Sequence, residues 1–364
     1  MLVTAFAFAA TLLLMIGLRP LAPALGLIDR PGGRKKHDGE VAVIGGLAIF
    51  GGCLVGSTLL PEPVHVPVPF LLCATLLVAV GAADDRVDVS AWVRLGVQIT
   101  AAVIMVTSEG LVIRELGLWN GANSFDLGVF APLFTVLAIL AAINAFNMID
   151  GLDGLACSLG LVTILSLLAV AHGGPMSGIV PILAMLAATI GAFLPFNIPV
   201  GINHKVRCFM GDAGSTLIGF AVAWFGIRLS QTSAPQVQPV TILWLTALPL
   251  LELTVSFARR VAAGRSPLAA DADHFHHKLM RAGLSVRGAW ITLVSLAATF
   301  AITGLFLEYI EVAPLTSLAL LIVMSAGATR AMQKAHSWAG SLPTWMTERR
   351  QSPWLRQGLP ATST

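Results

Sequence analysis

Charged residues are scarce in this sequence. They make up 11% of its 364 residues, whereas an average soluble domain carries roughly 25%. Hydrophobic residues account for 56%, and the mean hydropathy is +0.83. Water cannot dissolve a globule of this composition. The scarcity of charge therefore excludes an ordinary soluble domain and indicates that lipid is the solvent.

The sequence also lacks a pattern of paired cysteines, and we expect no cleavable leader. The four cysteines show no pairing pattern, so we interpret each as a small apolar residue rather than a disulfide partner or metal ligand. The N-terminus is apolar from its second residue, with no basic segment before the apolar run and no small-residue cleavage site. We therefore expect the first apolar run to be a membrane span.

What the sequence has instead is long apolar runs. Runs of about 17 to 21 residues match a hydrocarbon core of roughly 30 Å. They predict an all-α, polytopic membrane bundle of about 11 transmembrane helices. No short repeat divides the chain, so we expect one transmembrane domain over residues 1–331. A polar cytoplasmic tail follows over 332–364, either on the membrane surface or disordered. The predicted spans are 2–18, 43–60, 68–83, 92–108, 129–146, 155–171, 179–196, 215–230, 240–258, 289–307 and 315–331.

The basic residues predict the orientation of these spans. With eleven spans, all of the 22 Lys and Arg residues except Arg114 and Arg228 fall on one side of the membrane. An added or missing span midway would destroy this separation. The positive-inside rule makes that side cytoplasmic. We therefore expect a periplasmic N-terminus, a cytoplasmic C-terminus and a location in the bacterial inner (cytoplasmic) membrane.

Four polar clusters all fall on the basic side. They follow or precede different predicted spans, at the helix ends. A bundle can gather such ends into one acidic cup facing the cytoplasm. The clusters are DDRVDVS with Asp84 and Asp85, NAFNMIDGLDG with Asn144, Asn147, Asp150 and Asp153, RCFMGDAGST with Asp212, and ADADHFHHKLMRAG with His274, His276 and His277.

Carboxylates at a membrane edge are costly unless they are paired, solvated or bound to a cation. Oxygen ligands with basic neighbours suit Mg²⁺, which binds a few carboxylates together with substrate phosphates, whereas zinc prefers His and Cys. A single Asp at a helix end is often only a cap or a solvated charge. The five carboxylates together favour a site for a phosphorylated substrate with Mg²⁺.

Two basic clusters and one buried acid have competing interpretations. The three histidines could bind a metal, but neighbours on a helix do not all face one way, so phosphate binding or acid–base chemistry is favoured. The segment RPGGRKKHDGE, which includes Lys36, is either a substrate-binding loop or only the positive-inside signal. Glu252 lies about two turns inside the ninth predicted span, where a carboxylate suggests a function, and its role stays open.

The strings DDRVDVS, NAFNMIDGLDGLA, FMGDAGS and HFHHKLMRAGLS, in this order, resemble the polyprenyl-phosphate N-acetylhexosamine-1-phosphate transferases. The resemblance spans residues 19–290 and is to the WecA-like branch. It implies that undecaprenyl phosphate attacks the β-phosphorus of a UDP-N-acetylhexosamine, by default UDP-GlcNAc, and that UMP leaves. The lipid-linked product starts a cell-surface glycan such as O-antigen. The resemblance does not choose between one displacement and two.

The resemblance also implies roles for individual residues. Asp212 is the expected first metal ligand, Asn147 the second and Asp84 a candidate for the same ion. The expected catalytic residues are Asp84 and Asp85 near the lipid phosphate and Asp150 and Asp153 near the nucleotide. The expected substrate-binding residues are Asn147, Arg94, Arg265, His274, His276, His277 and Lys36.

The implied cofactor is Mg²⁺, with Mn²⁺ as an alternative. The implied partners are the UDP-sugar, undecaprenyl phosphate and the bilayer, with a homodimer as an option and no nucleic acid. Two other classes compete with this interpretation. A Mg²⁺-dependent intramembrane prenyltransferase would release pyrophosphate, but it leaves the GDAGS and HFHH strings unexplained. A secondary transporter would place its polar site near the midplane, whereas these clusters lie at one surface.

Overall fold

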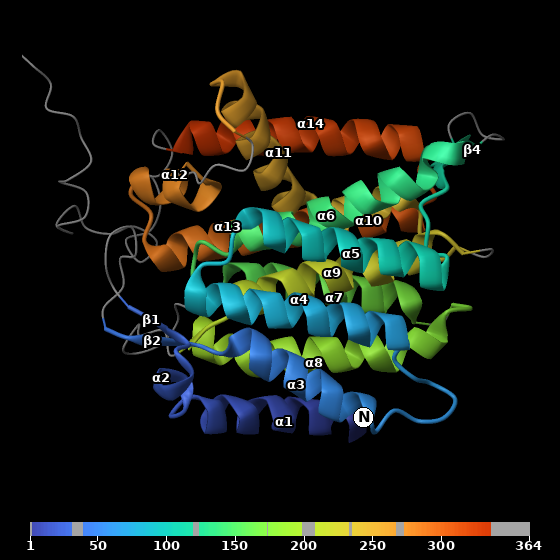
Figure 1. The fold of residues 1–364 in the computed structure, drawn as a ribbon. Coiled ribbons are helices and arrows are strands. Elements are labelled where there is room, and N and C mark those ends of the chain that lie inside the picture. The colour runs from blue at the N-terminus through green and yellow to red at the C-terminus, as the bar shows by residue number, and fades with distance from the viewer. Residues whose placement is uncertain are drawn as a thin grey trace, which may run out of the picture.

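A computed structural model describes residues 2–30, 39–118, 124–172, 174–198, 208–232, 235–266 and 273–335. It is an all-α bundle (Figure 1). Its helices are α1 (Leu2–Leu18), α2 (Ala22–Leu25), α3 (Gly45–Ser57), α4 (Val68–Val87), α5 (Ala91–Glu109), α6 (Ala131–Ile149), α7 (Leu155–Ala171), α8 (Val180–Asn197), α9 (Gly211–Ser230), α10 (Pro239–Leu245), α11 (Ala247–Ala262), α12 (Phe275–Arg281), α13 (Val286–Tyr309) and α14 (Pro314–Gln333). Two 3-10 turns, Gly128–Phe130 and Ser177–Ile179, precede α6 and α8.

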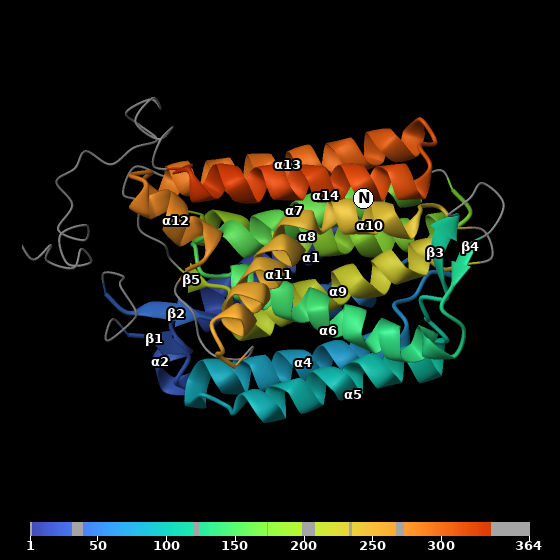
Figure 2. The ribbon, with the colours of Figure 1, turned by 90° about the horizontal axis from the view of Figure 1, so that it is seen from above.

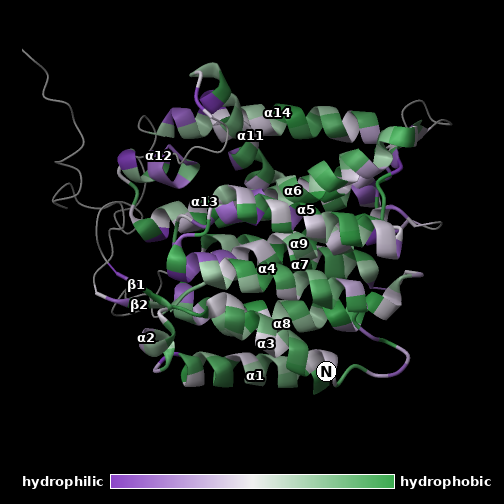
Figure 3. Cartoon of the chain, viewed as in Figure 1, coloured by the Kyte–Doolittle hydropathy of each residue, from purple (hydrophilic) through white to green (hydrophobic). Residues whose placement is uncertain are grey.

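The helices identify a multi-pass membrane protein. Every predicted apolar run contains helix. Within the described residues, seven helices are long and apolar enough to cross a membrane, and α1, α3 and α7 are shorter apolar helices. The total of eleven spans and their orientation stay predictions. Figure 3 shows hydrophobic residues along the middle of the bundle and hydrophilic ones gathered toward its ends.

The predicted ninth span is broken. Residues 240–258 were expected to form one helix, but α10 and α11 meet at an angle of 82° at Thr246. Pro249 explains the break. It has no N–H to donate to the carbonyl of Leu245, and its ring would clash with that carbonyl in a continuous helix. α10 therefore ends at Leu245, and α11 runs in a new direction.

α9 is the central helix. Its most apolar window is 94% buried, whereas that of α14 is only 17% buried. Phe70 of α4 packs against Phe220, Trp224 and Phe225 on one side of α9. Gly219 allows α6 to approach closely, since a Cβ there would lie 2.7 Å from the Cα of Ile143. Because α9 is enclosed, the N–H groups at its start cannot all be satisfied by water.

Two small sheets mark the two ends of the bundle (Figures 1 and 2). At one end, β2 (Val41–Val43) pairs antiparallel with β1 (Ile28–Asp29) and parallel with β5 (Cys208–Phe209). We call this the polar end; it also carries α12. At the opposite end, β3 (Glu115–Leu118) and β4 (Ser124–Asp126) form a hairpin. The register Val43↔Phe209 fixes the segment that leads into α9.

The four cysteines are buried and free, as expected from their apolar surroundings. Of the predicted tail, only residues 332–335 are among the described residues.

Candidate active site

The start of α9 is capped by a carboxylate from another helix. Asp85, in the last turn of α4, accepts hydrogen bonds from the backbone N–H of Asp212 at 2.9 Å and of Ala213 at 3.4 Å. These are two of the N–H groups that a helix leaves unpaired at its start. The arrangement also places negative charge at the positive end of the helix dipole. Asp85 therefore fixes the backbone that carries Asp212.

Three glycines allow this close approach. Gly211 has φ +73°, and a Cβ there would lie 2.3 Å from Oδ2 of Asp85. A Cβ on Gly81 of α4 would lie 2.4 Å from the backbone nitrogen of Ala213. A Cβ on Gly46 of α3 would lie 2.2 Å from the nitrogen of Gly214. Backbone contact among three helices thus brings the DDRVDVS and GDAGS strings together.

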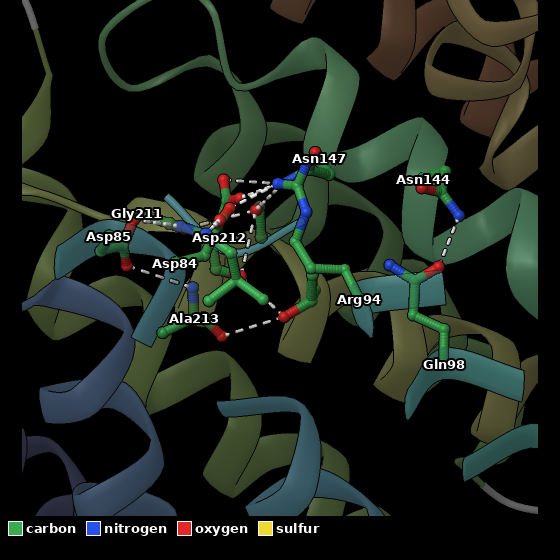
Figure 4. A network of polar contacts seen from close by, with 12 residues as sticks. Asp84, Asp85, Arg94, Gln98, Asn144, Asn147, Gly211, Asp212 and Ala213 are labelled. Atoms are coloured by element: carbon green, nitrogen blue, oxygen red, sulfur yellow. Dashed lines mark hydrogen bonds and ion pairs between the residues drawn. The ribbon is translucent and has the colours of Figure 1, made fainter. Parts of the chain in front are cut away.

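A polar network joins four helices at this point (Figure 4). The guanidinium of Arg94 donates to Oδ2 of Asp84 and, from the same nitrogen, to Oδ2 of Asp212 at 2.8 Å. The amide of Asn147 donates to Oδ1 of Asp212 at 2.8 Å and to the hydroxyl of Ser215 at 3.1 Å. Asp84, Asn147 and Asp212 therefore lie together as predicted, and Arg94 joins them.

The turn between α4 and α5 brings Arg94 to Asp84. Oδ1 of Asp84 accepts from the backbone N–H of Val89 at 2.7 Å, and Asp88 closes the helix with φ 54°. Ser90 then caps α5 through the N–H of Val93. The string DDRVDVS thus contains both the carboxylates and the turn that pairs one of them with an arginine.

The loop between α6 and α7 carries Asp150 and Asp153. Burial raises the pKa of Asp150 well above 3.8, and the negative charges of Asp212, Asp85 and Asp153 raise it further. Asn197 holds the end of the loop by accepting from the N–H of Gly154 at 2.9 Å. A dense group of carboxylates therefore lies within electrostatic reach of Asp150, and its negative charge favours binding of a cation.

The histidine segment lies beside this loop. His276 is 1% exposed, and a Cβ on Gly151 would lie 2.6 Å from its ring. Burial, followed by the positive charges of His277 and His274, lowers the pKa of His276 well below 6.5. Burial and the charge of His274 also lower the pKa of His277. His276 is therefore neutral at physiological pH and touches the loop between Asp150 and Asp153.

Asp273 anchors the start of the histidine segment. Its carboxylate pairs with Arg259 at 3.0 Å, with Lys278 at 3.5 Å and with Arg281. Burial alone would raise the pKa of Asp273, but the hydrogen bond from Arg281 and the charges of Lys278 and Arg259 outweigh burial and hold it below 3.8. The segment is therefore tied to the end of α11.

A groove of about 500 Å³ opens from the network between α4, α5, α6, α9 and α11. Arg94, Asn147 and Asp212 form its polar part together with Arg260 and His274. Gln98 and Asn144 also line it and hydrogen-bond to each other at 2.8 Å (Figure 4). Its apolar walls include Leu77, Leu95, Leu137, Leu140, Leu253 and Phe257.

The oxygen donors of the network suit Mg²⁺, because hard cations prefer carboxylate and amide oxygens. The carboxylates of Asp84 and Asp212 already converge on one positive group, the guanidinium of Arg94. Within the described residues, no three His, Cys, Asp or Glu side chains are arranged as a metal site. Asp84 and Asp212 with Asn147 are the residues that fit the ion, and metal binding stays a prediction.

Two predicted substrate-binding residues, Arg265 and Lys36, are not part of this network. Arg265 is exposed in the turn after α11. Lys36 lies outside the described residues. The sequence interpretation missed Gln98, Asn197 and Arg260. Gln98 and Asn197 had a signal, since each is a polar residue in or at the end of an apolar run.

The sequence of this chain is similar to those of several known proteins. A model of glycosyl transferase family 4 matches residues 68–230, from α4 to the end of α9. The undecaprenyl-phosphate alpha-N-acetylglucosaminyl 1-phosphate transferase of Yersinia pestis is 36% identical over 310 residues, which are 85% of this chain and 84% of that protein. The chain therefore belongs to glycosyl transferase family 4.

Two further relatives support this assignment. The proteins of the same name are 34% identical in Escherichia coli K12, over 84% of this chain and 83% of that protein, and 36% identical in Haemophilus influenzae, over 83% and 85%. The resemblance inferred from the four strings is therefore confirmed. The prenyltransferase and transporter interpretations are not favoured.

Proposed function

We propose that this family 4 member transfers GlcNAc-1-phosphate from UDP-GlcNAc to undecaprenyl phosphate and releases UMP. Its relatives carry this activity in their names. The observation that carries the proposal is the continuity of the groove with the carboxylate network: apolar walls from α4, α5, α6 and α11 lead to Arg94, Asn147 and Asp212. A lipid phosphate needs such a surface, because its chain requires an apolar wall and its headgroup requires polar partners.

Different residues of the chain would bind the acceptor, stabilise the charge of the phosphates and position Asp212. The apolar walls would hold the first isoprene units of the acceptor and direct its phosphate toward Arg94. A phosphate oxygen of the acceptor then attacks the β-phosphorus of the donor, and the bond to the UMP oxygen breaks. Arg94 would offset the charge of the meeting phosphates. Asp85 would act by holding the start of α9, so that Asp212 keeps its orientation.

Asp84, Asp212 and Asn147 would hold Mg²⁺, or Mn²⁺ in its place. When bound, the ion would supply positive charge to the phosphate oxygens and a template that orients them. Asp150, Asp153 and His276 lie together on the α6–α7 side of the site and would contact the nucleotide sugar.

We infer that the polar end faces the cytoplasm of a bacterial inner membrane, since UDP-sugars are water-borne and the basic residues favour that side. Carboxylates at helix ends would place the reaction at the depth where the lipid phosphate meets water.

A coupled assay tests the proposal. Protein purified in detergent should release UMP only when UDP-GlcNAc, undecaprenyl phosphate and Mg²⁺ are all present. A chelator should abolish release, and added Mg²⁺ should restore it. A panel of other UDP-N-acetylhexosamines would define the sugar. Failure to release UMP from any of these donors would overturn the proposal, whereas pyrophosphate release from a prenyl diphosphate would point to a prenyltransferase.

A further inference from the structure

Gln98 is an amide side chain in the wall of the groove that the reaction described above does not use. It lies on α5 one helical turn further from the polar end than Arg94. Its partner Asn144 lies on α6 one turn further from that end than Asn147. Both amides line the groove, and Gln98 is only 6% exposed, so the accessible part of its side chain faces the groove. A polar pair thus lies between the carboxylate network and the apolar walls.

The carbonyl of Leu140 fixes which way the two amides point. Nδ2 of Asn144 donates to this carbonyl at 2.8 Å and to Oε1 of Gln98 at 2.8 Å. A carbonyl oxygen can only accept, so the atom of Asn144 that faces it must be nitrogen. The atom of Gln98 that faces this nitrogen must in turn be oxygen. The amide nitrogen of Gln98 is therefore left for another partner, and Figure 4 shows it on the side of Arg94.

Within the described residues, this nitrogen of Gln98 has no hydrogen-bond partner. Water can satisfy it while the groove is open. When a ligand displaces that water, an N–H group left unpaired weakens binding. The groove therefore favours a ligand that brings an acceptor atom to Gln98. An isoprenoid chain has no such atom, and the only acceptors of undecaprenyl phosphate are the oxygens of its phosphate.

The lining of the groove indicates how the acceptor would lie along it. On α6 the lining changes from Leu137 and Leu140 to Asn144 toward the polar end. The chain would therefore contact the leucines, with the phosphate toward Arg94. Gln98 lies four residues beyond Arg94 on α5, which is about 6 Å along the helix. Its N–H would therefore meet the headgroup from the side on which the chain is attached.

We propose that Gln98 is a substrate-binding residue whose amide N–H donates a hydrogen bond to the acceptor phosphate from the side of the prenyl chain. Arg94 binds the same phosphate from the polar end. Two donors on opposite sides of the phosphate set the depth at which it stops in the groove. Asn144 holds the amide of Gln98 in the required orientation. This inference rests on the proposed function and adds a headgroup contact inside the groove.

Binding measurements in detergent test it, with farnesyl phosphate as a short acceptor and farnesol as the same chain without the phosphate. Gln98→Leu removes the donor and makes the wall more apolar. We expect the Kd for farnesyl phosphate to rise about 10-fold, as for loss of a hydrogen bond to a charged group. The Kd for farnesol should stay within about 2-fold or fall. A residue that only supports the fold would weaken both ligands alike.

Gln98→Glu is a second variant of nearly the same shape. It keeps an oxygen for Asn144 but replaces the N–H group with an acceptor that repels the phosphate. The Kd for farnesyl phosphate should rise at least as much as in Gln98→Leu. Gln231→Glu is the matched control: the amide of Gln231 accepts the backbone N–H of Arg114 at 2.9 Å, but at the opposite end. It should leave both Kd values unchanged.

Two results would overturn the inference. One is unchanged binding of farnesyl phosphate in both variants of Gln98. The other is an equal loss of farnesyl phosphate and farnesol binding in Gln98→Leu. Failure of the proposed function has a different signature, since unaltered protein would then bind farnesyl phosphate no more tightly than farnesol and release no UMP.

Discussion

At the end of the bundle that carries β3 and β4, two carboxylates have partners of their own. Glu109 pairs with Arg228 at 3.1 Å, and Glu308 accepts from the N–H of Gln238 and the hydroxyl of Thr241. At the polar end, one guanidinium, that of Arg94, is shared by Asp84 and Asp212. The negative charges of Asp212, Asp85 and Asp153 also raise the pKa of Asp150.

We propose that this difference separates structural from functional carboxylates. A carboxylate with its own partner is satisfied within the fold, and nothing further has to bind there. Carboxylates that repel one another around a shared arginine favour an added cation. Matched substitutions at the two ends should therefore give different results in activity, although each end uses similar chemical groups.

Asp212→Asn should produce the largest loss. The amide keeps the shape of the side chain but removes the charge that pairs with Arg94 and would ligate Mg²⁺. We expect kcat to fall by about 10²- to 10³-fold at saturating Mg²⁺, somewhat more than for loss of an outer-shell partner. UMP release measures it. Glu109→Gln makes the same change in charge at the opposite end, and its kcat should stay within about 3-fold of that of the unaltered protein. An equal loss of kcat in both variants would contradict the distinction between the two ends.

Arg94→Lys should have the next largest effect. One guanidinium nitrogen of Arg94 reaches Asp84 and Asp212 together. The lysine ammonium is more strongly hydrated and sits on a more flexible stem, so it is held less firmly between the two carboxylates. We expect kcat/KM for the acceptor to fall by about 10- to 100-fold. Arg228→Lys makes the same replacement in an ion pair with Glu109 and should change turnover by less than about 2-fold. Equal effects of the two replacements would contradict a functional role for the shared arginine.

The residues of this network show what could be predicted from the sequence. Asp84, Asn147 and Asp212 were expected to meet because all three lie on the same predicted side of the membrane, Asp84 and Asn147 just after their apolar runs and Asp212 just before its own. Helix ends on one side of a bundle can converge. The positions of the helices followed from the lengths of the apolar runs. These signals are local, and the membrane itself imposes them.

Contacts between distant backbones could not be predicted in this way. Asp85 was expected to act in catalysis, and that role stays a prediction. Its contact with the start of α9 depends on the approach of Gly81 to Ala213, which no local pattern indicates. The break at Thr246 needed the effect of Pro249 to be weighed against the apolar run. Glu252 was noticed as unusual, but its partners lie 22 and 23 residues further along the chain.

Gly211→Ala tests the backbone contact that supports the polar end. Alanine at φ +73° costs about 1 kcal/mol. Its Cβ would also displace Asp85, and loss of a helix cap costs about 1 kcal/mol more. Gly110→Ala is the matched control, because Gly110 has φ +62° at the end of α5 but no atom within 4 Å of an added Cβ. Thermal unfolding in detergent should show about twice the loss for Gly211→Ala. Equal losses would mean that the Asp85 side chain can move away from Gly211 without destabilising the fold.

The smallest expected effect is a dependence of stability on pH that arises at the polar end. The pKa of folded His276 lies well below 6.5, whereas in the unfolded chain it is about 6.5. Below that pH the unfolded state binds more protons, so stability falls as the pH drops, by up to about 1.4 kcal/mol per pH unit for one such group. Thermal unfolding between pH 7.5 and 5.5 should show this slope, and His276→Asn should reduce it whatever its effect on absolute stability. His277 shifts in the same direction, so part of the slope should persist. Equal slopes in the two proteins would mean that the pKa of His276 is the same in the folded and unfolded states. The side chain of His276 would then have to lie outside the enclosed position against Gly151.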